Sequence, residues 1–254
     1  MNEAVIPGAD ILLAFDTSTP LGSVAVAVSA GTDVLARAEL RKQGAHSSEL
    51  LPKIRETLDE GGVDLSEVSG LVVGAGPGSF TGVRVAAATA KGLAQALEIP
   101  LWPISSLEAG AAAVDAPGVP LSDGPRAELS KDQRDLPRYV LFDARSDRVY
   151  AACYLPTDKG LEELISPHST TIGEILSGDA PMSVFVGDGA ARHADEIRGA
   201  GFSVLAEPLG MPTADGLLTV LRKGPARAPL DDVARWEPDY LRPSSAERLS
   251  TRSS

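Results

Sequence analysis

Residues 71–94 read LVVGAGPGSFTGVRVAAATAKGLA, which is an apolar run, a turn containing Gly74, Gly76 and Gly78, and an alanine-rich run. The apolar run predicts a buried strand, and the alanine-rich run predicts a helix that a neighbouring segment can approach closely. Glycine leaves no side chain in the way and tolerates positive φ, so the turn can bring its N–H groups close to another part of the chain. An anion held at the helix N-terminus is the alternative interpretation of the same turn.

The composition of the 254-residue chain excludes several classes of function. Its net charge of −12 argues against direct binding to nucleic acid, because phosphate contacts require clustered Lys and Arg. Any role on RNA would therefore need a basic partner. The single cysteine, Cys153, excludes an internal disulfide and a thiolate metal cluster, and we expect it in the core. No apolar run reaches the roughly 18 residues of a membrane span, and residues 1–10 lack the features of a signal peptide. We therefore expect a cytoplasmic protein with no membrane partner.

A pattern near the start of the chain returns in its second half. Residues 11–28 predict two strands joined by a polar turn that begins at Asp16, and residues 139–155 repeat this pattern around Asp143. The apolar strand and glycine turn of the opening stretch return at residues 183–190, ahead of a second predicted helix. Two halves with the same order of elements indicate a duplicated architecture.

This duplication predicts an α/β protein with a duplicated actin-like fold, in which two mixed-sheet subdomains are flanked by helices, as in actin, sugar kinases and heat-shock chaperones. We place the N-terminal subdomain at residues 9–113, a connector or surface excursion at 114–138, and the C-terminal subdomain with its tail at 139–245. In this fold the Asp turns and the glycine turns face one cleft, which in active members holds nucleotide phosphates and a metal.

Three segments carry a family resemblance: ILLAFDTSTPLGSVAV from Ile11, HSSELLPKI from His46 and GAGPGSFTGVR from Gly74. Together with the ending WEPDYLRPS from Trp236, they resemble the TsaB family of bacterial tRNA threonylcarbamoyladenosine biosynthesis proteins. The resemblance covers most of residues 11–245 and leaves the predicted excursion uncovered.

The resemblance implies a chain without a catalytic or metal site. An active relative, TsaD, holds a metal through a His-x-x-x-His pair, and the corresponding positions of this chain carry Ser106 and Gly110. The residues support this independently, because His46, His168 and His193 are not spaced to share one helical face as a metal pair would. For the same reason we reject a metallopeptidase, and the lack of a GxxxxGK[ST] motif excludes a P-loop.

The turns of the predicted cleft are the candidates for a vestigial cofactor site. They comprise Asp16, Ser18, Gly76, Gly78 and Asp143. The favoured interpretation is that they shape turns, with the polar side chains bonding their own backbone, and a residual phosphate site is the alternative. Arg84 lies near the start of the predicted helix, where a cation is electrostatically unfavourable, so we expect it to meet an anion or a carboxylate.

Two predicted helices, at residues 47–60 and 81–97, form the candidate partner interface. One carries a leucine-rich stripe and the other offers Ala and Gly, which suits close packing. The resemblance implies that such a pair forms a four-helix bundle with its mate. The predicted interface residues are His46, Leu50, Leu51, Ile54, Arg84, Ala87, Ala90 and Ala94. The alternative is that both helices simply cover this chain's own sheet.

The function implied by the resemblance is that of a non-catalytic dimerisation and activator subunit. The complex that it would support transfers a threonylcarbamoyl group to N6 of adenosine 37 in tRNAs that read codons starting with A. The expected partners are a TsaD-like catalytic subunit, a TsaE-like ATPase reached through the complex, and a second copy when the chain is alone; tRNA would be contacted only indirectly. No cofactor is firmly expected, and the presence of ATP or ADP at the partner interface is left open. The alternative is a small-molecule kinase or ATPase that uses Asp16 and Asp143 around Mg-ATP.

Overall fold

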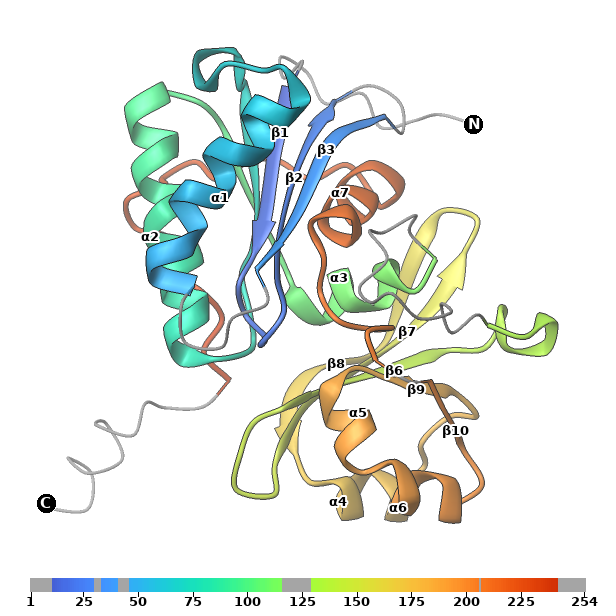
Figure 1. Cartoon of the computed structure of the whole chain (residues 1–254). Helices are drawn as coiled ribbons and strands as arrows, with labels where there is room; N and C mark the ends of the chain where they lie inside the picture. The colour runs from blue at the N-terminus through green and yellow to red at the C-terminus, as the bar shows by residue number, and fades with distance from the viewer. Residues whose placement is uncertain (1–10, 30–32, 41–45, 116–128, 206, 242–254) are drawn as a thin grey trace, which may run out of the picture.

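The computed structural model of the chain describes residues 11–29, 33–40, 46–115, 129–205 and 207–241. These residues form two five-stranded sheets, one above the other in Figure 1, with helices packed around them. No helix among them combines the length and the apolar character that a membrane span requires.

The first sheet is mixed, with the strand order β3-β2-β1-β4-β5. Its strands are β1 (Ile11–Asp16), β2 (Gly22–Val28), β3 (Val34–Leu40), β4 (Gly70–Gly74) and β5 (Leu101–Ile104). The central strand β1 pairs antiparallel with β2 and parallel with β4. Because successive strand residues point to opposite faces, Leu13 and Phe15 enter one core, and Leu12 and Ala14 enter another.

The second sheet repeats the topology of the first. Its strands are β6 (Arg138–Asp143), β7 (Val149–Thr157), β8 (Gly160–Thr170), β9 (Val184–Val186) and β10 (Ser203–Val204). Read from β8, the order β8-β7-β6-β9-β10 has the same sequence of antiparallel and parallel neighbours as the first sheet. The predicted duplicated actin-like fold, with two mixed sheets flanked by helices, is therefore confirmed.

Helices cover the outer face of each sheet, and two more lie between the sheets (Figure 1). The outer helices are α1 (His46–Gly61) and α2 (Phe80–Leu97) on the first sheet, and α4 (Ile172–Ser177), α5 (Asp188–Arg192) and α6 (Ala194–Gly199) on the second. The inner helices are α3 (Ser106–Ala113) and α7 (Ala214–Lys223). Short 3-10 turns occur at Leu65–Glu67 and Lys131–Gln133. Helix α3 serves both halves, since Ala109 enters the core under the first sheet and Leu107 the core under the second.

Several elements differ from the sequence-based expectations. The single helix expected through Ile197 is two short helices, because the chain leaves helical geometry at His193 between α5 and α6. Strand β8 went unpredicted because it is an edge strand whose exposed residues, such as Glu162 and Glu163, break the apolar alternation. The helices α4 and α7 and the strand β10 were also unpredicted. Cys153 is buried in β7, as predicted, and burial raises the pKa of its thiol to about 12.

Helix α7 packs on the first sheet although it follows the second sheet in the chain. Its residues Leu217 and Leu221 share a core with Leu12 of β1 and with Ala109 of α3. The predicted subdomain limits at 9–113, 114–138 and 139–245 stay a prediction. Residues 116–128 of the predicted excursion lie outside the described part of the chain.

The segment after α7 returns to the first half of the chain and is hydrogen-bonded to it. The N–H of Leu230 donates to the carbonyl of Leu101 (2.9 Å), and that of Asp239 donates to the carbonyl of Ala75 (2.9 Å). Trp236 packs against the core beneath α1 and α2. The described part of this tail thereby reaches the first turn of α2.

Arg138 is a buried cation at the start of β6. Its side chain is 2% exposed, Nη1 donates to the carbonyl of Ala111 at the end of α3 (3.2 Å), and Nη2 pairs with Asp115 (2.5 Å). The Asp115 side chain is itself 52% exposed. A half-exposed carboxylate therefore neutralises a charge that has no access to water.

We predict that Asp115→Asn destabilises the protein by about 3 kcal/mol, because it leaves the buried guanidinium without its counter-ion. Asp132→Asn, which changes an exposed carboxylate on the adjacent 3-10 turn, is the matched control and should shift stability by less than about 0.5 kcal/mol. Urea unfolding of the three proteins measures both values, and equal stability of the two variants would contradict the role given to Asp115.

Candidate functional site

The polar turn after β1 is organised by the fully buried carboxylate of Asp16. Its Oδ1 accepts hydrogen bonds from the backbone N–H of Ser18 (2.6 Å) and from the Ser18 hydroxyl (2.7 Å). Its Oδ2 accepts from the hydroxyl of Ser106 at the start of α3 (2.6 Å). Both oxygens are thus engaged inside the protein, which agrees with the turn-forming interpretation of Asp16 and Ser18.

The glycine turn after β4 packs directly onto this polar turn. A Cβ built at Gly74 would lie 1.7 Å from Oδ2 of Asp16, and one at Gly78 would lie 2.2 Å from the carbonyl oxygen of Ser18. The N–H of Ser79 donates to that same carbonyl (2.6 Å). The glycines of this turn are therefore required for contact between two segments of the same chain.

Ser106 and Gly110 occupy the positions predicted to correspond to the histidine pair of TsaD. The hydroxyl oxygen of Ser106 bridges the two turns, because it also accepts a hydrogen bond from the N–H of Gly76 (3.1 Å). At Gly110 an added Cβ would lie 2.5 Å from the carbonyl oxygen of Gly210, so the packing leaves no room for a ligating side chain. Among the residues described, no group of three or more His, Cys, Asp or Glu side chains is placed to hold a metal. The sequence alone gave no signal that Ser106 would be the partner of Asp16.

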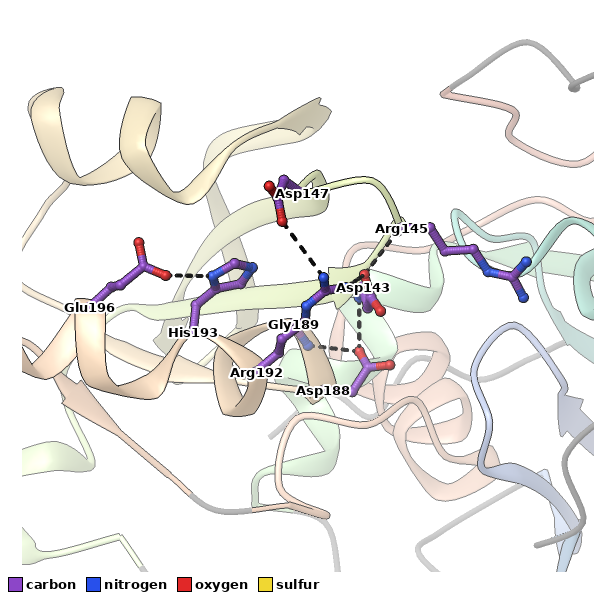
Figure 2. Close-up of polar contacts among 8 residues, drawn as sticks. All are labelled: Asp143, Arg145, Asp147, Asp188, Gly189, Arg192, His193 and Glu196. Atoms are coloured by element: carbon purple, nitrogen blue, oxygen red, sulfur yellow. Dashed lines mark hydrogen bonds and ion pairs between the residues drawn. The ribbon is translucent and has the colours of Figure 1, made fainter.

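Asp143, the counterpart of Asp16, is held in a different way (Figure 2). Its Oδ1 accepts from the N–H of Arg145 (2.8 Å) and pairs with Nη1 of Arg192 (2.8 Å), while its side chain remains 32% exposed. Its own N–H donates to Oδ1 of Asp188 at the start of α5 (3.1 Å). The second half therefore closes its turn with an arginine on α5, where the first half uses a serine on α3.

Asp188 is the titratable group of this second cluster. Its Oδ1 also accepts from the N–H of Gly189 (2.9 Å). Burial raises the pKa of Asp188 to about 6, assisted by the nearby carboxylates of Glu207 and Asp143, and the two backbone N–H bonds only partly oppose this rise.

Five of the predicted interface residues lie in the chain's own core. Leu50 and Ile54 of α1 and Ala87, Ala90 and Ala94 of α2 are each no more than 5% exposed. This corrects their assignment, because side chains that pack under the sheet cannot meet a partner in this fold. Leu51 is 56% exposed on α1. His46 begins α1, but its side chain lies outside what the structure describes.

The opposite face of α2 is exposed, and the long side chains of Arg84 and Gln95 lie on it beside small residues. It carries Ala88, Gly92 and Ala96, which are exposed residues spaced four apart. A Cβ added at Gly92 would meet no atom of the described residues within 4 Å. Arg84, Lys91 and Gln95 recur at helical spacing on the face of Ala88, so the sequence contained a signal for the exposed face of α2.

Comparison with known proteins places the chain in a family. The model of the TsaD family, described as tRNA N6-adenosine threonylcarbamoyltransferase, matches residues 34–207. The tRNA threonylcarbamoyladenosine biosynthesis protein TsaB of Escherichia coli strain K12 is 30% identical over 237 residues, which cover 91% of this chain and 94% of that protein. This chain belongs to the TsaB family.

Other matches extend over most of the chain. The TsaB protein of Bacillus subtilis strain 168 is 28% identical over 246 residues, 93% of this chain and 96% of the relative. A crystal structure from Pseudomonas aeruginosa, described as an uncharacterized protein with similarity to peptidase YeaZ, superposes with a TM-score of 0.71 at 27% identity, covering 92% of this chain and 100% of that one. A second structure, YeaZ from Pseudomonas aeruginosa, has a TM-score of 0.63 at 28% identity and covers 83% and 90% of the two chains.

In this member of the TsaB family, Arg84 contacts aromatic rings where an anion was expected. Its guanidinium carbon lies 3.7 Å from the centre of the Phe80 ring and 5.6 Å from that of Tyr240, and Nε donates to the Tyr240 hydroxyl (3.2 Å). The negative faces of the rings provide the electrostatic compensation. Arg84 thereby joins the first turn of α2 to the C-terminal tail.

We predict that Ser106→Ala destabilises the protein by about 1–3 kcal/mol, because it removes a donor to the buried Asp16 carboxylate and leaves the Gly76 N–H unpaired. Ser177→Ala, at an exposed serine of α4, is the control and should be close to neutral. Thermal unfolding without added ligand measures the difference. A neutral Ser106→Ala would show that Ser106 does not serve to hold the two turns together.

We predict that Asp188→Asn stabilises the protein increasingly as the pH rises. The folded pKa is raised to about 6 from an ordinary value of 3.8, so the ionised form is disfavoured in the folded state and the cost appears between these two pH values. The Asn oxygen can keep both N–H bonds, so the gain should grow from about 1 kcal/mol near pH 4.5 to about 3 kcal/mol near pH 7.5. Denaturant unfolding at both pH values tests this. Asp158→Asn, at an exposed turn, should give no such trend.

Proposed function

We propose that this chain is a non-catalytic dimerisation and activator subunit in tRNA threonylcarbamoyladenosine biosynthesis. The complex that it supports transfers a threonylcarbamoyl group to N6 of adenosine 37 in tRNAs reading codons that start with A. Its relatives carry the name of that pathway. The structural observation that carries the proposal is the exposed small-residue face of α2 at Ala88, Gly92 and Ala96.

The non-catalytic part of the proposal is supported by the start of α3. Ser106 and Gly110 stand where the resemblance places the metal-binding histidines of TsaD. The Ser106 hydroxyl is engaged with Asp16 and with Gly76, and Gly110 lies against the Gly210 carbonyl. These positions are therefore built into the packing between the two halves, and a ligating pair has no place there.

The exposed face of α2 suits a helix from a partner. Residues spaced four apart form a ridge along a helix, and a ridge of Ala and Gly lets a second helix approach closely. The exposed Leu51 of α1 provides an adjacent apolar side chain, and Arg84 lies at the N-terminal end of the same face. We infer that this surface binds a TsaD-like catalytic subunit, and that it pairs with a second copy of the chain when the catalytic subunit is absent.

The remaining partners follow from the charge of the chain. With a net charge of −12, contact with tRNA is expected only through the basic surfaces of other subunits. A TsaE-like ATPase is reached through the complex. The protein acts in the cytoplasm and contributes no cofactor of its own, and any ATP or ADP would lie at the partner interface.

We predict that Ala88→Arg weakens binding to the TsaD-like subunit at least about tenfold, because a long charged side chain must be accommodated on a close-packed face. The protein should remain folded, since Ala88 is exposed. The control, Ala200→Arg, is exposed at the end of α6 in the other half and should bind normally. Calorimetry measures binding, and reconstituted tRNA modification with each variant measures activation.

Three results would contradict the proposal. The first is modification of tRNA at an undiminished rate when the chain is omitted, and the second is normal binding by Ala88→Arg. The third is turnover of Mg-ATP by the isolated chain that is lost in Asp16→Asn, which would favour the kinase or ATPase alternative. Charged substitutions at Ala87 or Ala90 are unsuitable tests, because both side chains are buried and the variants would unfold.

A further inference from the structure

A cavity of about 170 Å³ lies between β8 and α4, on the outer face of the second sheet. In Figure 1, α4 lies at the bottom of the view and β8 is labelled near its middle, whereas α1 and α2 lie at the upper left. Tyr139 of β6, Ile165 and His168 of β8, and Glu174 and Asp179 beside α4 line it. An engineered cavity of similar size, about 150 Å³, holds a six-carbon ring in another protein, so the space suits a ligand of about six heavy atoms.

The Tyr139 side chain supplies a polar group without a protein partner. The residue is 3% exposed, and its ring stacks on Phe185 with 5.0 Å between ring centres. Its hydroxyl forms no hydrogen bond with any residue that the structure describes. The hydroxyl oxygen is not among the fully enclosed unpaired polar atoms of the described residues, so it is reached through the cavity. Burial raises the pKa of Tyr139 to about 12, so the hydroxyl keeps its proton and can donate or accept.

Two exposed carboxylates, those of Glu174 and Asp179, line the cavity. Oε2 of Glu174 accepts from the Thr170 hydroxyl (2.6 Å) and from the Thr171 N–H (3.0 Å), which lower the pKa of Glu174 and keep it ionised. Its Oε1, and both oxygens of Asp179, have no hydrogen bond or ion pair within the described residues.

The side chains around the two carboxylates add hydrogen-bond acceptors. Among the described residues, no Lys or Arg lines the cavity. Arg148 acts on Glu174 electrostatically, but its guanidinium donates to the hydroxyl and the carbonyl of Ser169. Nδ1 of His168 lies 2.8 Å from the carbonyl oxygen of Ser166, so the tautomer with the proton on Nδ1 satisfies that contact and leaves Nε2 as an acceptor.

We propose that this cavity binds a small organic cation, namely a primary ammonium or guanidinium group on a short methylene stem. Glu174 and Asp179 neutralise the charge, the Tyr139 hydroxyl and His168 Nε2 accept further N–H groups, and Ile165 and Ile175 contact the stem. A metal ion fits less well, because no metal-binding group of three His, Cys, Asp or Glu is present among the described residues. The inference does not depend on the proposed role in tRNA modification, since the cavity is remote from α2.

Titration of the isotope-labelled full-length protein by NMR tests the proposal. The probes are n-butylammonium and ethylguanidinium, with n-butanol and butyrate as neutral and anionic controls of similar size. We expect both cations to shift the signals of β8 and α4 in a saturable manner, and neither control to do so. The double variant Glu174→Gln/Asp179→Asn should bind at least about tenfold more weakly, because two charge-assisted contacts are lost. The glutamine retains an oxygen for the Thr171 N–H.

Further variants separate the cavity from general surface charge. Tyr139→Phe keeps the ring and removes the hydroxyl, and it should weaken binding about threefold to tenfold. The control Glu162→Gln removes an exposed carboxylate of β8 that does not line the cavity, and it should bind as the wild type does. The proposal is overturned if neither cation binds at tens of millimolar, if butanol or butyrate binds equally well, or if the double variant and Glu162→Gln have the same affinity as the wild type.

Discussion

The buried carboxylate of Asp16 is the contact on which the arrangement of the first half depends. It accepts hydrogen bonds from the N–H and hydroxyl of Ser18 in its own turn and from the hydroxyl of Ser106 on α3. The Ser106 hydroxyl oxygen in turn accepts a hydrogen bond from the N–H of Gly76. Three segments that are distant in sequence thereby meet around one side chain: the turn that follows β1, the glycine turn and the start of α3. Because the glycine turn leads straight into α2, this contact also fixes which face of α2 is buried and which is left exposed.

The two halves share a topology but close their equivalent turns with different chemistry. In the first half, neutral hydroxyl groups satisfy a carboxylate that has no access to solvent. In the second half, Asp143 stays partly exposed and pairs with Arg192. Asp188 accepts hydrogen bonds from the backbone N–H groups of Asp143 and Gly189 (Figure 2). The first arrangement needs close packing and small residues, and the second tolerates charge and water. The two halves therefore contain one Asp turn that is closed to solvent, at Asp16, and one that is partly open to solvent, at Asp143.

The sequence was sufficient where structure is decided locally. The strand, glycine turn and helix at residues 70–97, and the repeated Asp turns at β1 and β6, follow from apolar runs interrupted by Gly, Pro, Asp and Ser. It was insufficient where long-range packing decides. Nothing near Ser106 signals that its hydroxyl meets Asp16. On α2 the polar residues Arg84, Lys91 and Gln95 indicate an exposed face, and the prediction of Ala87 and Ala90 as interface residues did not use that signal. Arg84 was expected to meet an anion, because its aromatic partner Tyr240 is 156 residues away.

The position of α7 bears on how the protein is made. The inner face of the first sheet consists of residues from β1, β2, β4 and β5, all of which leave the ribosome early, yet the cover for that face includes Leu217 and Leu221. Until residues 214–223 have been synthesised, the emerging N-terminal half holds an apolar surface that it cannot bury by itself. Folding of this half is therefore completed only after translation of the second sheet, and the nascent chain is a natural client for chaperones during that interval.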